Sequence, residues 1–272
     1  MPPEDAPPSL FDRLLDDAAM FPPGNADAGT AIAEHLDYRA GPLDRYVGPL
    51  LVHADRWPEV GAAHVAAGSP PLEVVVLGAT TPPGPVPGLR VVGAELPVPA
   101  LPLPTSPEGL PVACEVTADD TGLAVLEAIA SSGRGDYVGK FRTGGTTASA
   151  FPDEAQLARI VVAAARTGTP MKYTAGLHHA VRFRDTVTGF EHHGFLNLLV
   201  AVQGALTGAS ERDVADVLAR RAATTLVDAV RGWSTDEVAA VRRSFVSFGC
   251  CGVGDPVDDL VALGLVTFAK EA

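Results

Sequence analysis

The stretch PVACEVTADDTGLAVLEAIASSGRGDYVGKFR, residues 111–142, decides the fold. Compact apolar runs stand at its two ends, 111–117 and 136–142, and runs with little polar alternation are typical of parallel strands covered on both faces. Between them, Asp119 and Asp120 are candidate caps of a helix with an apolar stripe, and Gly133 is a candidate stop. This order predicts a βαβ unit.

The same pattern continues along the chain in both directions. Compact apolar runs predict further strands at 47–54, 72–79, 89–96 and 170–176, with weaker candidates at 224–231 and 245–249. Helical spacing predicts helices within 9–20, 151–170, 193–207, 211–221 and 235–244. Eight strands with helices between them predict an α/β fold, a (β/α)8 TIM-type barrel, as a single domain over residues 1–272. An open doubly wound sheet is the alternative, although the chain lacks the Gly-rich motifs of nucleotide-binding folds.

Composition and charge limit the classes of molecule that the protein is expected to bind. The formal net charge is −13, which argues against nucleic acid or an anionic membrane as a partner, because both bind basic surfaces. The first residues are acidic and Pro-rich and do not resemble a secretory signal, so we expect a cytoplasmic protein. Three cysteines are too few for a disulfide framework. A small anionic metabolite remains the expected partner, and the chain is compatible with a homo-oligomer; we predict no cofactor and no metal.

Charged residues stand late in several of the predicted strands. Side chains two residues apart share a face of a strand, so Lys140 points the same way as Arg142, and Lys172 the same way as Thr174. Glu95 and Glu115 occupy similar late positions. Outward positions facing helices tolerate charge poorly, so we expect these five charges to converge at the C-terminal mouth of the barrel, where such folds build active sites. The alternative is a purely structural cluster of ion pairs.

Lys172 is the leading candidate nucleophile. A lysine close to another cation and away from water has a lowered pKa and can attack a carbonyl to form an imine, and Lys140 would be that cation. Glu115 would serve as the general base. The alternatives are that Lys172 binds an anion as an ammonium group or neutralises Glu115.

Two further groups complete the predicted site. The loop RTGGTT, residues 142–147, follows a strand, and Arg142 with the backbone of Gly144 and Gly145 would hold an anionic group. His178 and His179 are predicted proton-transfer groups. The remaining predicted substrate-binding residues are Thr174, Glu95, His193 and Asn197. A metal site built from the histidines and Glu115 is the alternative, but adjacent histidines point in different directions.

Five segments together resemble a widespread bacterial family of uncharacterised proteins. They are DDAAMFPP, KFRTGG, KYTAGLHH, HHGFLN and SFGCCGVGDPVDDLVALGL, and they span residues 15–265. In that family the last segment more usually reads SFGSCSF, so Cys250 and the stretch Gly252–Gly254 depart from it. The string from Lys172 to Gly176 is also similar to the Schiff-base strand end, K-x-[ST]-x-G, of class I aldolases of the deoxyribose-phosphate type. That similarity implies imine chemistry at Lys172, with a second lysine on the following strand, whereas Lys140 is on the preceding one.

The residues therefore favour an enzyme that acts on a small anionic carbonyl compound, such as a sugar phosphate or a keto acid, in a lyase, aldolase or isomerase reaction. Two alternatives stay open. One is a metal-dependent hydrolase or lyase that uses His178, His179 and His193. The other is a non-catalytic protein that binds an anionic metabolite.

Overall fold

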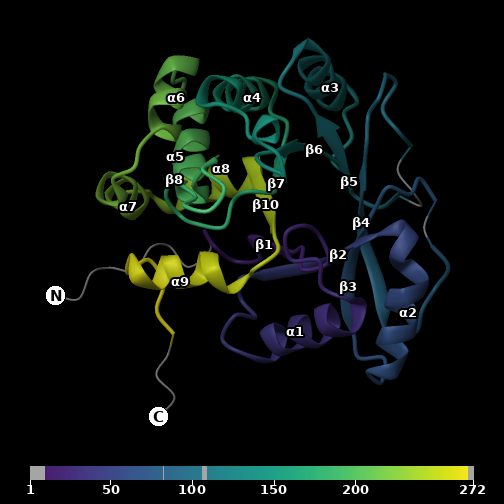
Figure 1. Cartoon of the computed structure of the whole chain (residues 1–272). Coiled ribbons are helices and arrows are strands. Elements are labelled where there is room, and N and C mark those ends of the chain that lie inside the picture. Colours follow the sequence, from purple (N-terminus) through teal and green to yellow (C-terminus); the bar gives the residue numbers. More distant parts are fainter. Residues whose placement is uncertain (1–9, 82, 106–108, 269–272) are drawn as a thin grey trace.

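Parallel strands close into a barrel in the computed structural model, which describes residues 10–81, 83–105 and 109–268 (Figure 1). The order around the barrel is β1-β10-β7-β6-β5-β4-β3-β2, and β10 closes it by pairing with both β1 and β7. The strands are β1 Leu15–Asp17, β2 Val47–His53, β3 Leu72–Leu77, β4 Leu89–Leu96, β5 Val112–Val116, β6 Tyr137–Arg142, β7 Met171–Thr174 and β10 Phe245–Cys250. The predicted eight-stranded α/β barrel is confirmed for the described part of the chain.

Helices surround the barrel, but they are unevenly distributed along the chain (Figure 1). Single helices follow β1, β2, β5 and β6, and four helices lie between β7 and β10. They are α1 Ala28–Ala40, α2 Trp57–Ala66, α3 Asp120–Ser131, α4 Glu154–Thr167, α5 Phe195–Leu206, α6 Glu211–Leu218, α7 Ala223–Arg231, α8 Thr235–Ser244 and α9 Gly254–Ala262. After β7 the chain also forms a small antiparallel hairpin of β8 Phe183–Arg184 and β9 Glu191–His192. No helix among the described residues is both long and apolar enough to cross a membrane.

Helix α4 shows how local sequence sets these elements. The Asp153 side chain accepts a hydrogen bond from the backbone N–H of Gln156, and the Gln156 side chain accepts one from the N–H of Asp153, which closes a capping box. The helix ends at Gly168, whose φ of +70° is the left-handed conformation that glycine adopts at little cost. Its apolar face, including Leu157, Ile160 and Val161, is fully buried in the main core.

The predicted helix at 9–20 is wrong, because β1 runs through its middle. Residue 9 lies outside the described residues. Leu15–Asp17 pair with β2 on one side and β10 on the other. Asp16 and Asp17 point to opposite faces, where Asp17 meets His35 of α1, with Oδ2 2.9 Å from Nδ1. A strand of three residues is too short to show its own periodicity, so the apolar spacing of its neighbours misled the prediction.

The predicted strand at 224–231 is also wrong, because those residues belong to α7. Its buried residues are Leu226, Val227 and Val230. They lie at positions i, i+1 and i+4, which share one side of a helix. The two errors offset each other, so the predicted number of strands agrees with the observed barrel.

Candidate active site at the mouth of the barrel

Strand register brings the predicted charges onto one inner surface. Lys140 pairs in register with Glu115 on β5 and with Lys172 on β7, and Lys172 pairs with Ser247 on β10. Residues paired in register point to the same face of a sheet. The structure therefore brings together the five charged residues that the sequence predicted.

A buried chain of ion pairs forms the centre of this cluster. Lys140 Nζ lies 2.7 Å from Glu95 Oε2, and Lys172 Nζ contacts the other oxygen of Glu95. Lys172 Nζ also lies 2.6 Å from Asp16 Oδ2. All four side chains are at most 6% exposed. Two ammonium groups thus alternate with two carboxylates, and the buried set is electrically neutral.

Asp16 is the member of this series of ion pairs that sequence reasoning missed. It lies on β1, and its Oδ2 also accepts a hydrogen bond of 2.7 Å from the Ser247 hydroxyl. The signal was the pair DD within the otherwise apolar stretch LLDDAAM. A carboxylate within an apolar stretch needs a buried partner of opposite charge. Two inward lysines with Glu95 as their one fully buried carboxylate required a second carboxylate, and Asp16 supplies it.

The ion pairs set the protonation states of the buried groups. Burial alone would raise the pKa of Glu95, but the ammonium groups of Lys172 and Lys140 outweigh it and lower that pKa to about 2. Burial would lower the pKa of Lys172, yet the carboxylates of Asp16 and Glu95 outweigh it and raise the pKa. The expected lowering of the Lys172 pKa by Lys140 is therefore wrong. Lys172 is held as an ammonium group.

A second, more exposed pair lies at the rim. Arg142 Nη2 is 3.4 Å from Glu115 Oε1, and Lys140 Nζ is 3.6 Å from the same oxygen. The side chain of Arg142 is 54% exposed and that of Glu115 is 38% exposed. Arg142 is therefore accessible to a ligand, while Glu115 is already engaged by two cations.

A cavity of about 950 Å³ opens at this end of the barrel. Lys140, Arg142 and Thr174 line it, and so does Gly145, whereas Lys172, Glu95 and Glu115 do not. The chain has three lysines, of which Lys270 lies outside the described residues. Of the two in the barrel, Lys140 is the one that lines the cavity.

The glycines after β6 divide into two roles. A Cβ on Gly144 would lie 2.9 Å from the Cα of Gly176, so Gly144 allows the loops after β6 and β7 to pack closely. Gly176 has a φ of +79°, the left-handed region that favours glycine. Gly145 lines the cavity and Gly144 does not. Of the two glycines predicted to hold an anionic group, only Gly145 therefore lines the cavity, while Gly144 allows the two loops to pack closely.

Three histidines line the cavity, and they are His178, His179 and His192. The Nδ1 of His178 lies 3.6 Å from Cys250 Sγ, and its Nε2 lies 3.9 Å from Cys251 Sγ. Burial lowers the pKa of His178, so its imidazole is neutral at neutral pH. His179 Nδ1 lies 3.2 Å from a carboxylate oxygen of Asp259 on α9, which orients that ring.

His193, just before α5, and Asn197, in the first turn of α5, do not line the cavity. His193 is fully buried, and its Nε2 donates to the carbonyl of Pro152 at 2.8 Å. Asn197 accepts from the backbone N–H of Arg182 at 2.9 Å and donates to the carbonyl of Arg220 at 2.8 Å. Both side chains are satisfied by the protein itself, and His192, rather than His193, faces the cavity.

The predicted alternative of a metal site needs the histidines and Glu115 to converge. Among the described residues, no group of three or more His, Cys, Asp or Glu side chains is placed to hold a metal ion. His193 is bonded to Pro152 and His179 to Asp259, so the set that the sequence suggested is dispersed over separate contacts.

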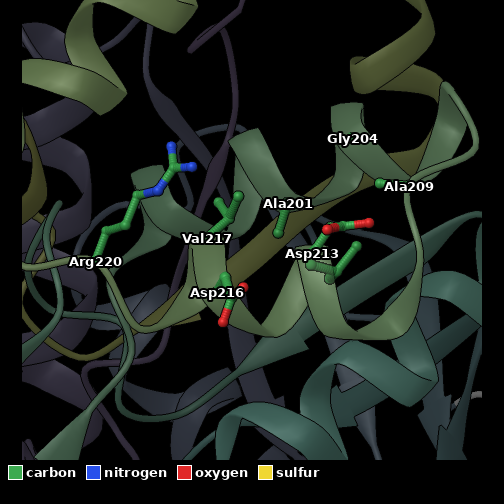
Figure 2. A pocket seen from close by; sticks show the side chains of 8 residues that line it. Ala201, Gly204, Ala209, Asp213, Asp216, Val217 and Arg220 are labelled. Atoms are coloured by element: carbon green, nitrogen blue, oxygen red, sulfur yellow. The ribbon is translucent and has the colours of Figure 1, made fainter.

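A smaller cavity of about 190 Å³ lies outside the barrel, where α6 meets α5 (Figure 2). Figure 2 shows Asp213 and Asp216 on α6, with Ala201 and Gly204 on the neighbouring helix. Asp213 serves in the N-terminal cap of α6, where it accepts from Ser210. Both carboxylates are exposed to solvent, so this cavity lacks the buried charges found at the barrel mouth.

No protein-family model, curated protein or solved structure matches the chain. The resemblance to the bacterial family and the similarity to class I aldolases therefore stay predictions.

Proposed function

We propose that the protein is an enzyme of the lyase, aldolase or isomerase type that acts on a small anionic carbonyl compound at the barrel mouth. One observation carries this proposal. Lys140 is buried and joined to Lys172 through Glu95, and it lines a cavity of about 950 Å³ at the C-terminal end of the strands. Active sites of such barrels are built at this end.

In the proposed reaction Lys140 binds the carbonyl oxygen of the substrate. A base removes a proton from the carbon beside the carbonyl, the electron pair moves onto the oxygen, and the ammonium group of Lys140 stabilises the resulting enolate. A fixed positive charge in a site that excludes water is an effective stabiliser of such an oxyanion. Return of the proton to the neighbouring carbon of the enediolate of a hydroxy-carbonyl substrate completes an isomerisation. In an aldol cleavage the base instead takes the proton of a hydroxyl group on the β carbon, the bond between the α and β carbons breaks to release a carbonyl compound, and its electron pair forms the enolate that Lys140 stabilises until the α carbon is protonated.

His178 is the proposed base. It lines the cavity, and burial keeps its imidazole neutral, which is the form that accepts a proton. Glu115, the base expected from the sequence, does not line the cavity and lies within 3.6 Å of two cations. Glu95, Lys172 and Asp16 act as positioning residues that hold Lys140.

Positive charge defines where the anionic group of the substrate binds. Lys140, Arg142 and the loop at Gly145 line one part of the cavity. Asp185 and Asp255 also line it and would repel an anion from their own part. The anionic group therefore belongs beside Arg142, with the carbonyl directed toward Lys140.

Imine chemistry is the competing mechanism, and it needs a neutral amine. The carboxylates of Asp16 and Glu95 keep Lys172 protonated, and Lys172 does not line the cavity. We therefore propose that the reaction forms no imine on Lys172, and that Lys172 acts only through its ion pairs with Asp16 and Glu95.

The proposal is tested by exchange of protons for deuterium in D2O, followed by NMR. The wild-type protein is incubated with short aldehydes and ketones that carry a phosphate or a carboxylate, with and without an aromatic substituent. The expected result is exchange beside the carbonyl of at least one compound, above the rate without protein. Binding without exchange across the panel would instead support the non-catalytic alternative and contradict the proposal.

A further inference from the structure

Phenylalanine side chains form part of the cavity wall. Phe21, Phe151, Phe183 and Phe190 line the cavity, and each is partly exposed to it. They are four of the 10 phenylalanines in the chain. Partly exposed aromatic groups that gather around a hollow are unfavourable in water and mark a binding site for apolar groups.

Three of these rings belong to one continuous series that we call the aromatic wall: Phe151, Phe190, His192, Phe183 and His179. Phe151 lies 5.2 Å from Phe190 and 4.6 Å from the His192 ring. His192 stacks on Phe183 at 4.8 Å, and the rings of Phe183 and His179 lie at a right angle with their centroids 4.6 Å apart. The series crosses from the segment after β6, over the β8–β9 hairpin, to the segment after β7. Each ring of the wall therefore packs against at least one other.

The cavity is much larger than the charged part of the site requires. Its volume of about 950 Å³ is at the upper end of the range of about 300–1,000 Å³ that binds ligands of drug size. A compound of three or four carbons would occupy the region of Lys140 and Arg142. Water would then remain against the aromatic wall.

We infer that the substrate is an amphipathic anion with an aromatic ring, whose anionic carbonyl end binds at Lys140 and Arg142 and whose ring packs against the aromatic wall. The inference rests on the proposed function for the chemistry of the reacting end. The preference for a ring depends only on the cavity and can be measured with ligands that do not react.

The test compares two matched ligands that contain no carbonyl group and therefore cannot undergo the proposed reaction. Methylphosphonate is compared with benzylphosphonate, and their dissociation constants are measured by calorimetry. We expect benzylphosphonate to bind at least tenfold more tightly. A difference below threefold would overturn the inference.

Variants locate the ring in the cavity. Phe183→Leu and Phe190→Leu remove aromatic surface and keep an apolar side chain, so each should reduce the benzyl advantage at least threefold. Phe268→Leu is the matched control, because Phe268 is exposed elsewhere on the chain and does not line the cavity. An unchanged advantage in both cavity variants would overturn the assignment of the wall. Thermal melting shows which variants are folded, and two independent positions keep the test decisive.

The two proposals fail separately. Tight benzylphosphonate binding with no exchange on any carbonyl compound would support the aromatic site and contradict the catalytic proposal. Exchange on short aliphatic compounds, with no benzyl advantage in binding, would support the catalytic proposal and contradict the aromatic substrate.

Discussion

Lys172 on β7 reaches across β10 to Asp16 on β1, where its Nζ lies 2.6 Å from the carboxylate. This ion pair spans the seam at which the first and last strands of the barrel meet. Both side chains are 6% exposed, and Lys172 also contacts Glu95. Lys172 is therefore a part of the barrel's closure as well as of the candidate site.

Removal of one partner of this seam should destabilise the fold. Lys172→Met leaves an excess buried negative charge and Asp16→Asn an excess positive one, and breaking a buried pair costs about 3–5 kcal/mol. The free energy of unfolding in urea measures the loss. The double variant Lys172→Met with Asp16→Leu restores neutrality and should recover part of it. Losses below about 1 kcal/mol in both single variants would contradict the assigned role.

Stability should fall in acid because of Glu95. Its pKa is lowered from 4.5 to about 2, so its contribution is complete above pH 4.5 and is lost as the pH falls toward 2. A shift of that size corresponds to about 3 kcal/mol. Urea unfolding from pH 6 to pH 2.5 should show a steeper decline for wild type than for Glu95→Gln. Parallel curves for the two proteins would show that Glu95 does not titrate in this way.

Much of this arrangement was predictable from the sequence. Apolar runs located seven of the barrel strands within the described residues, and alternation along them predicted that Lys140, Arg142 and Lys172 share the mouth. The strand β1 was not predictable, because three residues carry no periodic signal and both of its acids require distant partners. Because that strand was not predicted, Asp16 was not included in the predicted site.

The histidines show a second limit of the sequence. Adjacent residues such as His192 and His193 face opposite ways, and which one faces the cavity depends on the β8–β9 hairpin. The sequence does not encode that hairpin in a regular pattern. The predicted pKa of Lys172 was wrong because Asp16 was not recognised as its neighbour. A prediction of a pKa from sequence requires that every neighbouring charge be known.

Asn197 should matter for stability and not for ligand binding. Its side chain accepts from the N–H of Arg182 and donates to the carbonyls of Val217 and Arg220. Asn197→Ala leaves these buried groups unsatisfied, and each costs about 1–3 kcal/mol. We expect a loss of unfolding free energy of at least about 2 kcal/mol, with the dissociation constant of benzylphosphonate unchanged. Weaker binding of benzylphosphonate at unchanged stability would instead support the sequence-based prediction that Asn197 binds the substrate.

The two adjacent cysteines should differ in reactivity. Cys251 lines the cavity, whereas Cys250 is 3% exposed, and burial raises the pKa of both thiols. Since the thiolate is the reactive form, iodoacetamide should modify Cys251 slowly at pH 7 and faster as the pH rises above 9, and leave Cys250 unmodified. Mass spectrometry of the native protein measures both sites. Rapid modification of either cysteine at pH 7 would be inconsistent with this environment.

Borohydride trapping should leave Lys172 unmodified. Reduction in the presence of the carbonyl panel converts any imine into a stable adduct, which peptide mass spectrometry assigns to one of the three lysines. Lys270 serves as the reference for non-specific modification. An adduct at Lys172 above the level at Lys270 would show that this lysine loses its proton during the reaction.

The rate of proton exchange by Lys140→Met tests the central claim most directly. With the panel compound that wild type exchanges fastest, loss of the oxyanion-stabilising ammonium group should reduce the rate about 100- to 1,000-fold. His178→Asn should also reduce it at least 100-fold as the proposed base, while His53→Asn, a half-exposed histidine outside the cavity, should leave it unchanged. Wild-type rates in folded Lys140→Met and His178→Asn proteins would contradict a catalytic site at this barrel mouth.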